Sequence, residues 1–184
     1  MNAAWAQAAL LPVVGVALLV SVVTDFLSRR VLDRVTYPAA AACLALRFAG
    51  GGLGGTESGL TSGLIGAAGL GGVFAYFAWR ERMGWGDVKL TAVVGAGLGY
   101  PRVLAAAAFI SLAGALQAVV LLLWRGELGE TLGGMTHRTL QRLGRRSVPG
   151  TPVRDISPGR GVPYAIAIAL GTLWTFWWES STLG

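Results

Sequence analysis

The stretch Gly84-Trp85-Gly86-Asp87-Val88-Lys89-Leu90 lies between two apolar runs and places a carboxylate at the edge of a hydrophobic segment. An ionisable side chain at such a position indicates a functional site, because a charge is costly to bury in a bilayer. The glycines on either side of Trp85 would let the backbone turn with positive φ and let another segment approach closely. We expect Asp87 at the N-terminus of the next helix, where its carboxylate could also simply cap free N–H groups.

The composition around this motif is that of a membrane protein. The 184 residues are 54% hydrophobic and only 13% charged, with a mean hydropathy of +0.60, whereas soluble domains carry about 25% charged residues. The 28 glycines fit the close helix packing of a bilayer protein. A single cysteine, Cys43, excludes an internal disulfide and a multi-cysteine zinc site, and a single histidine, His137, argues against a histidine-based metal centre or a Ser/His triad. We therefore expect no metal and no cofactor.

Six apolar segments organise the chain. Four of them approach the ~20 residues that cross a bilayer: Ala4–Val23, Leu60–Trp79, Val103–Trp124 and Val162–Trp178. Two are shorter, and their lengths would equally suit buried or re-entrant helices: Pro38–Ala49 and Val88–Tyr100. The pattern predicts an all-α membrane protein, a polytopic bundle of about six transmembrane helices that forms one domain over residues 1–184.

The basic residues predict the orientation of this bundle. If the connection at 25–37 is cytoplasmic, 13 of the 15 Lys and Arg residues fall on the cytoplasmic side, leaving only Arg47 and Arg102 outside. By the positive-inside rule, both chain ends should face away from the cytoplasm. Membrane orientation thus accounts for the net charge of +6, and we expect no nucleic-acid partner. The basic cytoplasmic loop at 125–160 is either a disordered orientation signal or contains a short helix that lies on anionic headgroups.

This topology brings a second carboxylate to the same membrane face as Asp87. Asp25 leaves the first span and Asp87 enters the fourth, so two helices of one bundle could bring them together. Two carboxylates in a partly dry site share a proton, because one of the two pKa values rises. The ionised partner could then take a proton from water while the protonated one polarises a carbonyl. That is the apparatus of aspartyl peptide hydrolysis, which needs no metal.

Other charged residues near the two aspartates are weaker candidates. Asp33 lies in a loop with three arginines and should be solvated or ion-paired; it could also contact substrate. Arg29 and Arg30 could contact substrate or lipid headgroups. Lys89 follows Asp87 by two residues and should point to the other side of the helix, where it could bind headgroups or substrate, or bias the local field.

The two acidic stretches resemble those of the prepilin peptidases, also called type IV leader peptidases, of the GxGD aspartyl protease class. Residues 84–90 look like the family's Gly-x-Gly-Asp-x-Lys signature. Residues 25–38 are similar to its first catalytic stretch, in which an Asp precedes basic residues, a triplet and a helix-starting Pro. This chain departs from the Ile-Pro-Asn-like triplet and reads Val31-Leu32-Asp33. Residues 161–167 resemble the opening of the family's last span.

The resemblance implies a multi-pass enzyme of the bacterial inner membrane. Such an enzyme removes the short basic leader of a prepilin or pseudopilin at the cytoplasmic face, after a Gly and before an apolar helix. Asp25 and Asp87 map onto the two catalytic aspartates, with Gly84, Gly86 and Lys89 as supporting motif residues. Larger members also methylate the new N-terminus and carry a four-cysteine zinc region. A chain with one cysteine resembles the short, cleavage-only form.

Three other classes use similar residues. Presenilin-like proteases cut within transmembrane helices, but they pair the motif with a Tyr-Asp inside a span, whereas Asp25 follows Thr24 at a basic boundary. A proton- or cation-coupled transporter or assembly subunit would favour carboxylates at the midplane of the membrane. A Mg²⁺-dependent lipid transferase would need several carboxylates at helical spacing. The interfacial position of both aspartates favours the leader peptidase.

Overall fold

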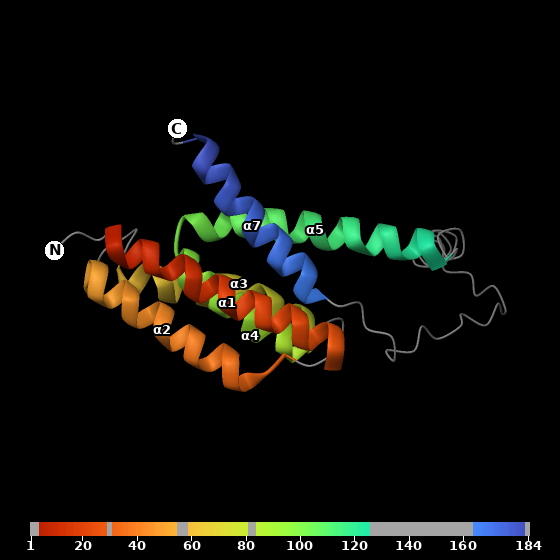
Figure 1. Cartoon of the computed structure of the whole chain (residues 1–184), viewed down its shortest axis with the longest axis horizontal. Helices are drawn as coiled ribbons and strands as arrows, with labels where there is room; N and C mark the ends of the chain where they lie inside the picture. The colour runs from red at the N-terminus through yellow and green to blue at the C-terminus, as the bar shows by residue number, and fades with distance from the viewer. Residues whose placement is uncertain (1–3, 29–30, 55–58, 81–83, 126–163, 183–184) are drawn as a thin grey trace, which may run out of the picture. The chain divides into compact units, whose positions relative to one another are not determined.

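The computed structural model describes residues 4–28, 31–54, 59–80, 84–125 and 164–182. Within these ranges the protein has six α-helices and no strand, so the predicted all-helical fold is confirmed (Figure 1). Arg29, Arg30 and residues 126–163 lie outside the described residues; they include most of the basic loop and the first three residues of the stretch 161–167 that resembles the family's last-span opening.

Three described helices are long and apolar enough to cross a membrane: Trp5–Ser28, Leu60–Trp79 and Arg102–Leu121. Many of their large apolar side chains are exposed, among them Leu19, Val73 and Leu112. Exposed apolar surface on long apolar helices is expected where lipid replaces water as the solvent. The chain is therefore a membrane protein, while the count of six spans and the orientation of the chain ends stay predictions.

Four helices correspond to the four long predicted segments: α1 (Ala4–Ser28), α3 (Leu60–Trp79), α5 (Arg102–Arg125) and α7 (Tyr164–Thr182). The predicted end of the first segment at Val23 is too early, because α1 continues through the polar residues Thr24 and Asp25. Asp25 therefore belongs to the last turns of a helix and not to the loop after it.

The predicted start of the second segment at Pro38 is wrong. The helix α2 (Asp33–Gly51) begins before this proline, and Asp33 lies in its first turn. An acidic residue is favourable there, because the helix dipole places partial positive charge at the N-terminus. The hydroxyl of the buried Thr36 lies within hydrogen-bonding distance of the Leu32 carbonyl, at 3.4 Å, which also suits a helical turn before Pro38.

The chain divides into two compact units, one made of residues 1–114 and 163–184 and the other of residues 115–162. The first unit contains every residue of the core and site described below. Of the second unit, the structure describes only the final part of α5, residues 115–125. The prediction of one domain over the whole chain stays a prediction.

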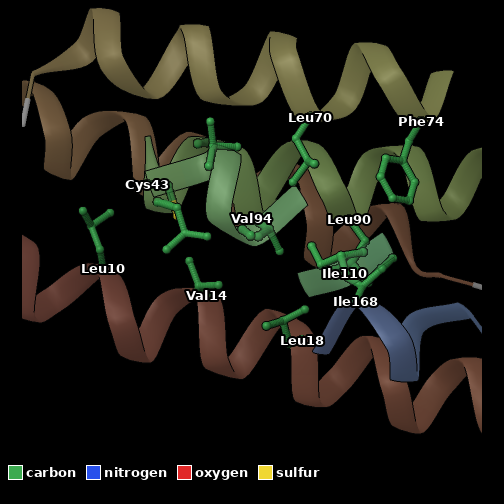
Figure 2. Close-up of a cluster of buried hydrophobic side chains, with 14 of the residues drawn as sticks. Leu10, Val14, Leu18, Cys43, Leu70, Phe74, Leu90, Val94, Ile110 and Ile168 are labelled. Carbon is green, nitrogen blue, oxygen red and sulfur yellow. The ribbon is translucent and has the colours of Figure 1, made fainter. Parts of the chain in front are cut away.

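The core of the first unit is built around α4 (Trp85–Leu98), which α1, α2, α3 and α7 all contact. From Val93 to Leu98 every residue of α4 is buried, as expected of a helix that is apolar on all sides. In Figure 2, Leu10, Val14 and Leu18 of α1 point toward Val94 of α4. With 14 residues, α4 is about 21 Å long, shorter than a hydrocarbon core of about 30 Å.

Glycines let α3 and α4 touch backbone to backbone. A Cβ added at Gly66 of α3 would overlap the carbonyl oxygen of Gly95 of α4, and a Cβ at Gly95 would overlap the carbonyl oxygen of Gly66. Small residues at helix crossings are the usual means of close packing in a bilayer. The crossing fixes where α4, and hence the motif at its start, lies in the bundle.

The C-terminal end of α4 is held by a buried arginine of α2. Arg47 is 4% exposed; its Nε donates to the carbonyl of Ala96 at 2.7 Å, and its Nη2 donates to the carbonyl of Gly97 at 2.8 Å. These carbonyls belong to the last turn of the helix, which lacks intrahelical donors. Directly after α4, Gly99 has a positive φ of 65° and lies so close to the guanidinium that a Cβ there would lie 2.5 Å from the Arg47 Cζ atom. Arg47 therefore anchors the end of α4 that is opposite to Asp87.

Candidate active site

Asp25 continues the inward-facing stripe of α1. The buried residues Leu10, Val14, Leu18 and Ser21 recur every three or four positions, and Asp25 follows Ser21 at the same spacing. This periodicity places all five side chains on one face of the helix. The Asp25 Oδ2 atom is indeed buried. The carboxylate thus lies where the apolar stripe of α1 ends.

Asp87 lies in the first turn of α4, not at its cap. The N-cap residue is Gly84, and the structure gives no side-chain hydrogen bond at that cap. The backbone N–H of Asp87 donates to the Gly84 carbonyl at 3.2 Å, so the chain is already helical when it reaches Asp87. Asp87 therefore lies at the N-terminus of the helix, as predicted, where a carboxylate interacts favourably with the helix dipole. Its carboxyl is available to the cavity beside it.

The two motif glycines differ in what they do. Among the described glycines, positive φ values occur at Gly52 and Gly99, and Gly84 has φ of −73°, so the predicted positive-φ turn in the motif is wrong. The predicted close approach holds for Gly86, where an added Cβ would lie 2.9 Å from the Cβ of Val31. At Gly84 an added Cβ would make only an ordinary contact, 3.6 Å from the Asp87 Oδ2 atom. Gly86 is thus the glycine that the packing requires.

One cavity of about 330 Å³ brings the predicted site residues together. Its lining comes from the end of α1, from residues 31 and 33 at the approach to α2, and from the N-cap and first residues of α4: Asp25, Val31, Asp33, Gly84, Gly86, Asp87 and Lys89. This volume falls within the range of small-molecule sites and has room for a peptide bond with water. A second cavity, of about 30 Å³ beside Arg47, has room for only a water molecule or two. Of the two, the cavity with both aspartates can hold a substrate.

The surroundings of Asp87 favour its protonated form. Asp87 lies outside the three candidate membrane spans. Burial raises its pKa, and the negative charge of Asp25 raises it further, to about 7 from an ordinary value of 3.8. A raised pKa at Asp87, beside a second carboxyl, is what the sharing of one proton between two carboxyls requires. An acid and a base of this kind are what water activation needs.

Lys89 is paired with Asp33, and both residues line the cavity. Its Nζ atom donates to Asp33 Oδ1 at 2.6 Å and lies 5.2 Å from the centroid of the Tyr37 ring. The hydrogen bond to Asp33 raises the pKa of Lys89, so the ammonium keeps its charge. Asp33 is thus ion-paired, one of the two states that the sequence suggests. A salt bridge from Lys89 to Asp87 is not what the structure shows.

Sequence reasoning missed two residues of the site. Val31 was noted only as a departure from a family triplet, yet it lines the cavity and covers Gly86. Nothing in the sequence singles out Tyr37, yet its ring faces Lys89. Neither contact is local in sequence, and the one available signal was that both residues lie in the segment after Asp25.

In the described parts of the chain, no group of three or more His, Cys, Asp or Glu side chains is arranged to hold a metal ion.

Comparison with known proteins gives one match. A sequence model of the type IV leader peptidase family matches residues 13–119, which is more than half of the chain and includes both aspartates and the whole glycine motif. The chain matches no curated protein and no solved structure.

Proposed function

Because this chain belongs to the type IV leader peptidase family, we propose that it is a membrane-embedded aspartyl endopeptidase that removes the short basic leader of prepilins or pseudopilins. Asp25 and Asp87 are the catalytic pair in this proposal. The observation that carries it is that both carboxyls, from helices far apart in sequence, line one cavity of about 330 Å³. No metal or cofactor takes part in the proposed reaction.

The unequal surroundings of the two carboxyls suggest their roles. Asp87, whose pKa is raised to about 7, is the acid that donates a hydrogen bond to the carbonyl oxygen of the scissile bond. Asp25, ionised, accepts a proton from the attacking water, whose oxygen bonds to the carbonyl carbon while Asp87 gives its proton to the carbonyl oxygen. The resulting gem-diol collapses as Asp87 takes back a hydroxyl proton, the C–N bond breaks, and the amine leaves with the proton that Asp25 took, so both carboxyls return to their starting states.

The charge of the cavity suits a basic leader. Three carboxyls and one ammonium line it, so the site is net negative even when Asp25 and Asp87 share one proton. In the proposed orientation the site opens to the cytoplasmic face of the bacterial inner membrane, where 13 of the 15 basic residues would also lie. A substrate with its leader in the cytoplasm and its apolar helix in the bilayer would present the scissile bond at that depth.

Co-expression with a candidate prepilin tests the proposal, with leader removal read by mass. We expect Asp25→Asn and Asp87→Asn each to lower cleavage on the order of 10³-fold or more, because each removes one proton-transfer group of a pair that acts as a unit. Both variants should still accumulate in membranes. Asp155→Asn, the same chemical change in the loop predicted at 125–160, is the matched control and should cleave normally. Retained cleavage in either dyad variant would reject the proposal.

A further inference from the structure

Residues 31–33, which lead into α2, contact the start of α4 on both sequence sides of Asp87. Before Asp87, Gly86 lies against Val31, at a separation that leaves no room for a side chain. After Asp87, Lys89 donates to Asp33 at 2.6 Å. Asp87 lies between these two contacts in the sequence, and it lines the cavity together with Asp25. Movement of α2 relative to α4 would therefore move Asp87.

The ammonium of Lys89 has two partners on α2, an arrangement more defined than a single ion pair at a surface. The Lys89 ammonium is held by the carboxylate of Asp33 and by the face of Tyr37, one turn further along α2. The side chain of Lys89 is 31% exposed and that of Asp33 is 56% exposed. An ion pair of that exposure adds little to folding stability. Stability alone therefore does not account for an ion pair that lines the same cavity as the two aspartates.

We propose that Asp33 and Lys89 are positioning residues for the reaction proposed above, on which this inference rests. Their ion pair fixes the first turn of α4 against the start of α2, and so fixes where the Asp87 carboxyl stands relative to Asp25. Because Lys89 already neutralises Asp33, the charge that meets the substrate is that of the aspartate pair. Asp33 thus acts through Lys89 and does not bind the basic leader itself.

Steady-state kinetics on one leader-bearing substrate test this assignment. Asp33→Asn and Lys89→Met should each lower kcat about three- to tenfold, because a displaced carboxyl loses reactive geometry. KM should stay within about twofold of the wild-type value. The double variant should be no worse than either single one, because each change already breaks the same pair. Arg34→Gln, an exposed change on the same turn of α2, is the matched control and should leave both constants unchanged.

The outcomes separate this inference from the proposed function. If the wild-type chain does not cleave, the proposed function fails. If the wild-type chain cleaves and Asp33→Asn cleaves equally well, this inference alone is overturned. It is also overturned if Asp33→Asn raises KM while Lys89→Met does not, since Asp33 would then bind substrate. Finally, it is overturned if the loss of activity only follows a loss of folded protein, with kcat per folded molecule unchanged.

Discussion

The two ends of α4 handle charge in opposite ways. At the C-terminal end, the guanidinium of Arg47 is buried and donates to two carbonyls of the last helical turn. At the N-terminal end, the carboxyl of Asp87 lines a cavity that Asp25 also lines, and its pKa is raised to about 7. The charge of Arg47 is compensated by hydrogen bonds, whereas burial disfavours the charged form of Asp87. In the function proposed above, the first end serves the fold and the second serves the chemistry.

The largest effect on folding is expected at the Arg47 end. Arg47→Met removes the donors to Ala96 and Gly97, and each buried carbonyl left without a donor costs about 1–3 kcal/mol. We expect a large loss of membrane accumulation and a lower thermal midpoint in detergent. Arg47→Lys, which keeps the charge and can reach fewer acceptors, should recover part of the loss. Wild-type accumulation of Arg47→Met would show that the two ends of α4 do not differ as described.

A smaller effect, on activity and not on folding, is expected at the motif glycines. Gly86→Ala pushes against Val31 and should lower cleavage about tenfold by shifting the segment that leads into α2. Gly84→Ala meets only the Asp87 carboxylate, at 3.6 Å, with a backbone φ of −73° that alanine adopts readily, so it should cleave within about threefold of wild type. Val31→Gly, which removes the Cβ that the new methyl group meets at 2.9 Å, should restore part of the activity of Gly86→Ala. Equal losses at the two glycines would contradict the packing described here.

Much of this arrangement could be predicted from the sequence. The all-helical fold, the bounds of Leu60–Trp79 and the meeting of Asp25 with Asp87 follow from apolar run lengths, motif residues and the placement of basic residues. These features depend on local composition or on a topology that charge constrains. The family resemblance in the motifs is confirmed by the match over residues 13–119.

The remainder depends on tertiary contacts that periodicity does not encode. Arg47 interrupts a short apolar segment. The sequence predicts for it only a position on the non-cytoplasmic side, together with Arg102. Its role at the end of α4 requires knowing that α2 packs there. The start of α2 before Pro38 was missed because a polar stretch gives no apolar period. The contact of Val31 with Gly86 likewise joins two segments that only the folded chain brings together.

The central claim is that Asp25 and Asp87 share one proton near neutral pH. Since the pKa of Asp87 in the folded protein is raised from 3.8 to about 7, the folded chain holds its proton below that value and loses it as pH rises through about 7. Cleavage should therefore fall above this pH as the acid is lost. Removing the charge of Asp25 should lower the pKa of Asp87, while burial should keep that pKa above 3.8.

Infrared titration of the protonated-carboxyl band in the folded protein tests this directly, with the Asp87→Asn spectrum subtracted to assign the band. The account predicts a band that persists up to about pH 7 in the wild-type chain, is absent from Asp87→Asn, and disappears at a lower pH in Asp25→Asn. A wild-type Asp87 that is already fully ionised at pH 5, or one whose titration is unchanged by Asp25→Asn, would contradict the shared proton and with it the catalytic pair.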